Sequence, residues 1–443
     1  MRLWLKSPLA ILAEGAENGI VVEGSRIVEL VPRARAPLAP VDATFDASRH
    51  VVLPGLVNAH HHFYQTLVRA HPAGLKEDLV PWLVALYPIW GRVDARTLAL
   101  ASRMAMVELL LSGCTTTADH HNLFPPGLEH AIDIEVEEAL ALKMRLTATR
   151  GAMSFSVKNG GLPADEVVQD ADTIYEDCER VLKLFHDPKP GAMTQIALAP
   201  CSPLAVHKPL LEAMGALSAR CGCRLHTHWL QVEEEEAYCR SAYGLNSVDF
   251  LESTGWLNER VWLAHAVHYG PEDIQRVARA GVSICHCAAA DMLLSAGICP
   301  TRDYEAAGAA VGIGVDGSSS NDSSNMMEAV RHSLMLGRLR YGASKLTPYD
   351  ALRWATEGSA RCLGRGDIGK IEVGREADLA LFTLDEPRFS GAHDPIAALV
   401  LCGAHRADRV MVAGDWRVVD GAVVGLDLAQ LLAEHREAAK AFA

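Results

Sequence analysis

The sequence lacks three features that would place it among nucleic-acid-binding, membrane or secreted proteins. It has no excess of positive charge, since its net charge is -14 and its pI is near 5.7. That charge argues against nucleic acid or an anionic membrane surface as the main partner. No apolar run reaches the length of about 18 residues that a transmembrane helix needs. The N-terminus also lacks the charged, apolar and small-residue order of a secretory signal peptide.

Cysteine spacing and known catalytic motifs exclude further classes. The chain has 11 cysteines, an odd number without the spacing of a disulfide framework, which predicts a reduced, cytoplasmic protein. There is no Gly-x-Ser-x-Gly nucleophile elbow and no Walker phosphate loop. Pro200-Cys201 is not followed by the second cysteine of the Pro-Cys-x-x-Cys zinc signature. Serine hydrolases, NTPases and that zinc-deaminase fold are therefore disfavoured.

The most informative stretch is residues 51–62, an apolar run rich in β-branched residues that ends in three histidines. Such a run predicts a buried strand that carries ligands at its C-terminal end. Side chains alternate along a strand, so His60 and His62 are expected on one face and His61 on the other. Two adjacent imidazoles provide half of a zinc site.

Eight apolar, β-rich runs alternate with helical patterns, of which 97–111, 209–219, 271–280 and 324–336 are the clearest. This order predicts a (β/α)₈ TIM barrel, in which functional residues gather at the C-terminal ends of the strands. The runs are residues 51–62, 113–119, 145–151, 194–200, 224–229, 261–265, 282–287 and 311–316.

Short, turn-bounded strand patterns occupy both ends of the chain. The 20–30 segment predicts two strands joined by a turn at Gly24-Ser25, and further strands are expected at 367–373, 377–383, 410–413 and 416–419. We therefore expect residues 1–55 and 365–420 to form one small β-sandwich, 56–364 to form the barrel, and 421–443 to form a terminal helix.

Histidines end four of the predicted strands, and an aspartate ends the eighth. They are His60 and His62, then His226 and His228, His265, His286, and Asp316. A barrel brings such ends to one site. Three neutral imidazoles and one carboxylate can hold a zinc ion that activates water, and an aspartate beside it can accept the water proton. The remaining histidine can stabilise the hydroxide or a developing oxyanion.

The stretch 54–62, together with His228, His265 and Gly314-Val315-Asp316-Gly317, resembles the amidohydrolase superfamily over nearly the whole chain. It is most similar to the mononuclear branch of guanine and 8-oxoguanine deaminases and triazine hydrolases. The resemblance implies one divalent metal ion, zinc or alternatively iron. It also implies His60, His62, His228 and Asp316 as its ligands. Asp316 and His265 are then the catalytic pair that acts on water and the transition state.

Local similarity within this branch extends to 61–66, 81–90, 199–203 and 320–325. It implies that Gln65 faces the substrate and that the Trp82 segment covers the site, although Trp82 and Trp90 would equally suit simple packing. Arg150, at the third strand end, and His286, at the seventh, are further candidates for contact with the substrate.

The sequence departs from this branch at two places. Gln231 stands three residues after His228, where these deaminases usually carry a glutamate that protonates the substrate ring. A glutamine at this catalytic position can hydrogen-bond but cannot transfer a proton. After His286, Ala288, Ala289 and Ala290 replace a polar turn that is expected to face the substrate.

Three interpretations remain open. In the first, the enzyme deaminates an 8-oxoguanine-type heterocycle, with Asp316 or an acid among Glu233–Glu236 moving the proton. In the second, the substrate is a small guanidine-like compound, such as isocytosine or guanylurea, or an s-triazine. In the third, the chain is a non-catalytic metal-binding relative. For an enzyme, the expected partners are a small-molecule substrate and, as is common for soluble enzymes, further copies of the chain in a homo-oligomer.

Overall fold

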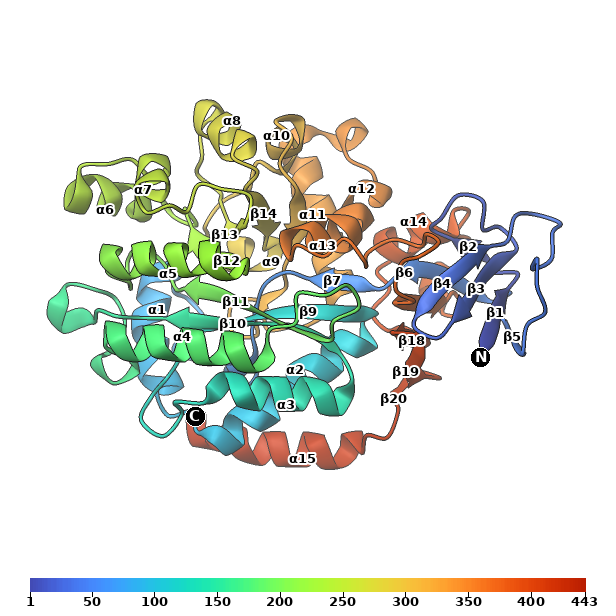
Figure 1. The fold of residues 1–443 in the computed structure, drawn as a ribbon, viewed down its shortest axis with the longest axis horizontal. Coiled ribbons are helices and arrows are strands. Elements are labelled where there is room, and N and C mark those ends of the chain that lie inside the picture. The colour runs from blue at the N-terminus through green and yellow to red at the C-terminus, as the bar shows by residue number, and fades with distance from the viewer.

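The computed structural model describes residues 1–443 and contains a closed barrel of parallel strands surrounded by helices (Figure 1). The (β/α)₈ prediction is confirmed. Ala59 N–H donates to the Ile313 carbonyl at 3.0 Å, which joins the first and last strands. In order around the barrel, the strands are β7 (Leu56–Asn58), β9 (Cys114–His121), β10 (Arg145–Ala152), β11 (Thr194–Pro200), β12 (Arg224–Trp229), β13 (Val261–His265), β14 (Ser283–His286) and β15 (Val311–Ile313).

Two short strands extend the barrel at the C-terminal ends of its first and last strands. They are β8 (His61–His62) and β16 (Asp316–Gly317), and they pair in parallel, with Asp316 opposite His61. This pairing brings the histidine cluster and the aspartate of the eighth run to neighbouring positions, although 255 residues separate Asp316 from His61 (316 − 61).

Helices cover the outside of the barrel, and α15 runs along one side beneath α2 and α3 (Figure 1). None of them combines the length and the apolar character that crossing a membrane requires. The helices are α1 (Leu79–Trp90), α2 (Ala95–Leu111), α3 (Ala131–Leu142), α4 (Ala171–Phe185), α5 (Lys208–Cys221), α6 (Glu233–Tyr243), α7 (Ser247–Ser253), α8 (Pro271–Arg279), α9 (Ala288–Leu293), α10 (Thr301–Ala306), α11 (Met326–Tyr341), α12 (Pro348–Arg353), α13 (Ser359–Cys362), α14 (Pro395–Leu401) and α15 (Leu428–Ala439).

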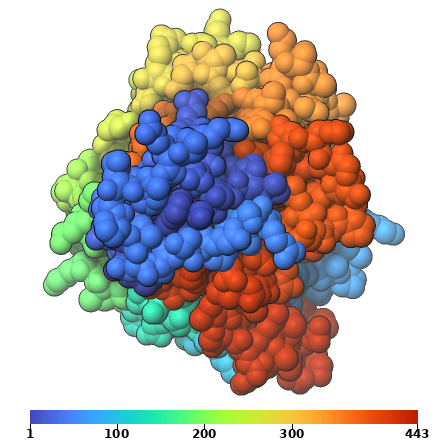
Figure 2. Space-filling view, turned by 90° about the vertical axis from the view of Figure 1, so that its right-hand side faces the viewer, coloured from blue at the N-terminus to red at the C-terminus, as the bar shows by residue number.

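Two further sheets form a separate β-structure beside the barrel. One contains β4 (Arg26–Leu30), β3 (Gly19–Glu23), β1 (Arg2–Lys6) and β5 (Ala43–Asp46). The other contains β2 (Ala10–Ile11), β6 (His50–Pro54), β17 (Leu379–Thr383), β18 (Arg409–Val412), β19 (Asp415–Val419) and β20 (Ala422–Val423). Leu5 and Val22 of the first sheet share one apolar core with Val52, Leu381 and Met411 of the second. N-terminal and C-terminal segments therefore lie side by side on this face of the molecule (Figure 2).

The apolar run 51–57 is divided between two sheets at Gly55, which differs from the single strand that the sequence predicts. Residues up to Pro54 pair with β17, whereas Leu56 starts the barrel strand β7. A side chain at Gly55 would place its Cβ 2.2 Å from Thr115 Oγ1, so the close approach requires glycine. His60 and His62 consequently enter the site from a short extension of the barrel wall.

Two expectations for the C-terminal region are wrong in detail. Residues 367–373 form turns instead of a strand, because Asp367 is committed to side-chain contacts: it pairs with Arg365 at 2.7 Å and accepts from Gly191 N–H at 2.7 Å. The segment from 421 is not entirely helical, since β20 pairs with β19 and α15 begins only at Leu428.

A buried ion pair connects the barrel to the small β-structure and gives a first prediction. Arg145 of β10 contacts Asp378 at 2.7 Å and Glu376 at 3.0 Å, and all three side chains are buried. Arg145→Met would leave Asp378 buried without its cation and Glu376 paired only with Arg26, so we expect the free energy of unfolding in urea to fall by about 3–5 kcal/mol. Arg49→Met is the control, because it breaks the exposed Arg49–Asp385 pair and should cost under about 1 kcal/mol. Equal losses in the two variants would contradict this account.

Candidate active site

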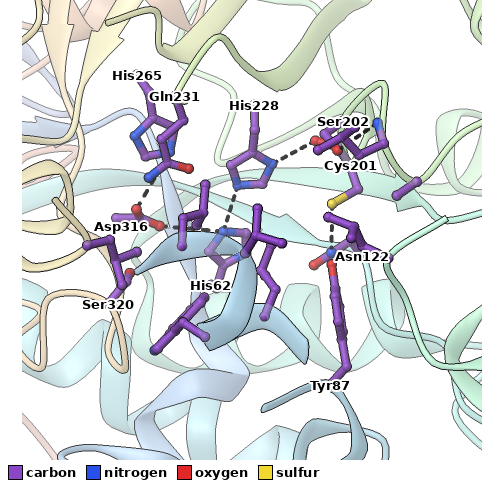
Figure 3. A pocket seen from close by; sticks show the side chains of 18 of the residues that line it. His62, Tyr87, Asn122, Cys201, Ser202, His228, Gln231, His265, Asp316 and Ser320 are labelled. Carbon is purple, nitrogen blue, oxygen red and sulfur yellow. Dashed lines mark hydrogen bonds and ion pairs between the residues drawn. The ribbon is translucent and has the colours of Figure 1, made fainter. Parts of the chain in front are cut away.

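The C-terminal ends of the barrel strands bring His60, His62 and His228 together, and Asp316 lies beside His60 and His62 (Figure 3 shows His62, His228 and Asp316). The Nε2 atoms of His62 and His228 are 3.0 Å apart. Asp316 Oδ1 lies 3.3 Å from His60 Nε2 and 3.5 Å from His62 Nε2. Atoms at these separations can all coordinate a single ion of the size of zinc.

The hydrogen bonds behind the rings fix which nitrogen of each histidine carries the proton. His62 Nδ1–H donates to the His120 carbonyl at 2.8 Å, and His228 Nδ1–H donates to the Cys201 carbonyl at 2.7 Å. His226 Nδ1–H donates to the Trp262 carbonyl at 2.9 Å, so its Nε2 accepts the Nδ1–H of His60 at 2.7 Å. Because a carbonyl can only accept, each of the three rings presents an unprotonated Nε2 to the cluster.

These lone pairs favour a bound cation. Two unprotonated Nε2 atoms at 3.0 Å repel each other without an ion between them, and His60 Nε2 is buried with no hydrogen-bond partner. Burial lowers the pKa of His60, His62 and His228, and this keeps the rings in the neutral form that binds metal. The donor set of three imidazoles and one carboxylate therefore fits a divalent metal such as zinc.

His120 is a site residue that sequence reasoning missed. It lies on β9, and its ring stacks on that of His228 with centroids 4.5 Å apart. Its Nε2–H donates to the Ala199 carbonyl at 2.8 Å, which leaves an unpartnered Nδ1 near the cluster. The sequence signal for it is the His120-His121 pair, which directly follows the second predicted strand at 113–119.

A second polar pair lies beside the cluster. His265 Nδ1–H donates to Asp291 Oδ1 at 2.9 Å, and His265 Nε2 lies 3.7 Å from Asp316 Oδ2. Burial lowers the pKa of His265, but the carboxylates of Asp291 and Asp316 outweigh burial and leave this pKa above its usual value. His265 and Asp316 both have left-handed backbone angles, with φ of 70° and 63°. Such strain at non-glycine residues concentrates at functional sites.

Asp291 is thus a positioning residue for His265, and it was not recognised from the sequence. Asp291→Asn removes the charge and the fixed acceptor behind His265, so we expect kcat/KM to fall by about 10–100-fold with the fold intact. The pH profile should shift as well, because the pKa of His265 depends on this carboxylate. Asp172→Asn, at an exposed position of α4, is the control. Activity within twofold of the wild type and an unmoved profile would show that Asp291 does not act through His265.

A cavity with about 690 Å³ of empty space opens directly onto the cluster, and this volume suits a small-molecule ligand. Gln65 and Trp82 line this cavity. Gln65 Oε1 accepts from the Ser319 hydroxyl at 2.7 Å and from its N–H at 3.2 Å, so the amide N–H₂ group is left to donate. Trp82 packs edge-to-face on Trp90, with ring centroids 5.0 Å apart, and the two form an aromatic wall with Tyr87.

Two residues that the sequence suggested as substrate contacts do not line the cavity. Arg150 is buried away from the cavity, because Asp177 at 2.5 Å and Gln169 at 2.8 Å bind its guanidinium, which also stacks on Phe124. His286 lies behind the site, with Nδ1 3.7 Å from Asp291 Oδ2. The residues Ala288–Ala290 form the buried start of helix α9 and do not line the cavity. The loss of polar side chains there consequently leaves the cavity wall unchanged.

The segment after β12 places two different polar side chains on the cavity. Gln231 lines it beside His265 (Figure 3). Among Glu233–Glu236, Glu235 alone is buried and lines the cavity, whereas Glu233 and Glu234 are exposed. Glu235 Oε2 accepts from Gln231 N–H at 2.7 Å, and burial raises the pKa of Glu235 to about 7.

A (β/α)₈ barrel with three histidines, an aspartate and a cavity at its strand ends defines the class of metal-dependent barrel hydrolases. Comparison with known protein families gives the same class. The amidohydrolase family model matches residues 51–417, so the chain belongs to that family. The chain is 56% identical to an 8-oxoguanine deaminase of Pseudomonas aeruginosa, over 99% of each chain. It is 33% identical to an isoxanthopterin deaminase from an unknown prokaryotic organism, over 90% of this chain and 86% of the relative.

The chain also shares its fold with a solved zinc-containing hydrolase. An atrazine chlorohydrolase from Arthrobacter aurescens TC1, complexed with zinc, is 32% identical with a TM-score of 0.92. The match covers 99% of this chain and 100% of that one. The chain is therefore a hydrolytic enzyme of a metal-dependent family, and its reaction class is hydrolytic deamination.

Proposed function

We propose that the enzyme removes the exocyclic amino group of 8-oxoguanine as ammonia. The observation that carries this proposal is the 56% identity to an 8-oxoguanine deaminase across 99% of the chain. The cavity supports it, because its volume suits a bicyclic base and the Trp82 wall offers a surface for stacking. Gln65 offers amide hydrogens to an acceptor edge of the base.

In this proposal His60, His62, His228 and Asp316 hold one divalent ion, which we propose to be zinc. A bound zinc ion lowers the pKa of a coordinated water toward neutrality. The hydrogen bonds from Nδ1 of the three histidines keep each Nε2 free for coordination. A zinc-complexed relative of the same fold supports the choice of metal.

Asp316 accepts a proton from the attacking water and later delivers it to the departing amine. Burial raises the pKa of Asp316, but the neighbouring His265 and the hydrogen bond from Gly317 N–H favour the charged form and leave this pKa below its usual value, so the carboxylate is ionised and ready to accept. His265, oriented by Asp291, stabilises the oxyanion that develops as water adds to the amidine carbon. Gln231 hydrogen-bonds the substrate without transferring a proton.

We further propose that the enzyme works in the cytoplasm as a homo-oligomer, without nucleic acid or membrane as a partner. The 11 free cysteines, most of them buried, support a reducing compartment. The net charge of -14 is unsuited to binding a polyanion. Homo-oligomers are common among soluble enzymes, which is the support for that assembly.

The test is the relative kcat/KM for 8-oxoguanine, guanine, isocytosine, a pterin, guanylurea and an aminotriazine, with protein of known metal content. We expect 8-oxoguanine to exceed the others by at least about tenfold, since a base whose hydrogen bonds match the site discriminates strongly against analogues that lack them. A preference for isocytosine or guanylurea would replace this substrate with a small guanidine-like one. A preference for the aminotriazine would instead group the enzyme with its triazine-hydrolysing relatives.

A further inference from the structure

Hydrolysis of an aminoheterocycle requires an acid on the ring-nitrogen side of the reacting carbon. Water adds to the amidine carbon only as the adjacent ring nitrogen gains a proton, because that nitrogen otherwise becomes an anion. In this enzyme Gln231 stands near the position expected for such an acid, and its amide has no proton to give. Another side chain on the cavity wall has to supply the proton.

Glu235 has the geometry for this task. It lies in the first turn of α6, one helical turn beyond Gln231, and only 3% of its surface is exposed. Its Oε2 accepts the Gln231 N–H at 2.7 Å and is 3.5 Å from the Val232 nitrogen. The backbone of Gln231, the residue that stands where related deaminases carry a glutamate, therefore holds the Glu235 carboxyl group in place. No protein group hydrogen-bonds Oε1, and Glu235 lines the cavity together with Gln231, His228 and His265.

The remaining candidates are less suitable. Asp316 belongs to the ligand cluster and already handles the water proton. Glu233 and Glu234 point into solvent, and Glu236 binds Ser247 N–H at 2.9 Å on the far side of α6. The titratable groups that face Glu235 are His265 at the end of β13, Cys201 after β11, and Cys239 and Glu234 on its own helix. His265 already acts on the oxyanion, burial raises the pKa of the Cys201 and Cys239 thiols to about 12, and Glu234 is exposed, so Glu235 is the group left for the ring nitrogen.

We propose that Glu235 is the catalytic acid that protonates the substrate ring nitrogen, in the role that Gln231 cannot fill. This inference rests on the proposed deamination and assigns the missing proton donor within it. As the water oxygen bonds to carbon, one water proton goes to Asp316 and the Glu235 proton goes to the ring nitrogen. Asp316 then protonates the amine, the C–N bond breaks to release ammonia, and the remaining hydroxyl proton returns to Glu235 as the carbonyl forms. Water has then supplied both new protons, and Glu235 is restored.

The test compares Glu235→Gln with the wild type at equal metal content. Glutamine keeps an oxygen to accept the Gln231 N–H, so α6 retains its first turn, but it cannot donate a proton to the ring. We expect kcat to fall by about 100-fold or more. We also expect the wild-type rate to fall as pH rises through about 7, where Glu235 loses its proton, and this decline should be absent in the variant. Glu234→Gln, one residue away and exposed, is the control and should behave as wild type.

A second variant separates the loss of an acid from damage to the fold. Gln231→Glu, introduced into the Glu235→Gln background, returns a carboxyl group to the position used by related deaminases and should recover much of the lost rate. If Glu235→Gln is as active as the wild type with an unchanged pH profile, the assignment is overturned while the proposed function stands. If wild-type protein with bound metal releases ammonia from none of the heterocycles, the proposed function fails and the assignment fails with it.

Discussion

The Asp316→Asn variant is expected to lose turnover by about a thousandfold or more while it still folds. Asp316 has two proposed roles in this site. Its carboxylate lies within 3.5 Å of the Nε2 atoms of His60 and His62 and can coordinate the metal, and it also accepts the water proton. An amide can still coordinate weakly through its oxygen, but it cannot accept or return a proton at neutral pH. The measurement is kcat for ammonia release, together with metal content and thermal unfolding of the same preparation.

Metal content decides how the Asp316→Asn result is interpreted. Bound metal with the rate lost would assign the defect to proton transfer, whereas loss of the metal would assign it to coordination. Asp385→Asn, at an exposed position of the small β-structure, is the matched control and should leave kcat unchanged. A variant that retains its metal and more than a tenth of the wild-type kcat would show that another group accepts the water proton.

Removal of the metal is expected to abolish activity reversibly and to lower the melting temperature. Three unprotonated Nε2 atoms converge at the site, and without a cation their mutual repulsion destabilises the folded state. Metal that binds only the folded chain raises its stability by about 2.7 kcal/mol when its free concentration is 100 times its Kd. We therefore expect added zinc to restore both the rate and the melting temperature of chelated protein.

His62→Ala is the control for this experiment, because it removes one coordinating nitrogen from the cluster. Zinc should shift its melting temperature far less than that of the wild type at the same concentration. Full activity of protein that elemental analysis shows to be free of metal would contradict the site described here.

Much of the barrel could be predicted because its strands are buried runs bounded by helical patterns. The run 224–229 and the strand Arg224–Trp229 coincide, and the run 145–151 differs from its strand by one residue. Because His62, His228, His265 and Asp316 follow or end predicted barrel strands, the sequence also predicts that they lie near one another. Their separations of 3.0–3.7 Å are a property of barrel closure, which no local pattern reports.

The division at Gly55 could not be predicted because both halves of the run are buried. β6 and β7 consist of fully buried residues, so hydrophobic periodicity has no break at the point where the chain passes from one sheet to the other. Similarly, Asp367 belongs to a turn because of its contacts with Arg365 and Gly191, residues whose proximity is a tertiary effect.

The substrate side of the site was the least predictable part. Arg150 ends a barrel strand as expected, but side chains alternate along a strand, and Asp177 of α4 provides its partner outside the barrel. Asp291 lies in a segment whose alanines suggested lost polar contacts, yet its own carboxylate reaches His265. Four consecutive glutamates begin α6, and only Glu235 is buried. Which of the four faces the cavity depends on the direction in which α6 leaves the barrel, and the sequence does not report that direction.

Hydrolytic deamination can be tested by following the water oxygen and the ammonia in one experiment. Protein with one metal per chain is incubated with each heterocycle in water enriched in oxygen-18, and ammonia and the mass of the product are measured. We expect one ammonia for each product molecule from 8-oxoguanine, with one heavy oxygen at the carbon that carried the amino group. No ammonia from any of the heterocycles, with the metal bound, would contradict it.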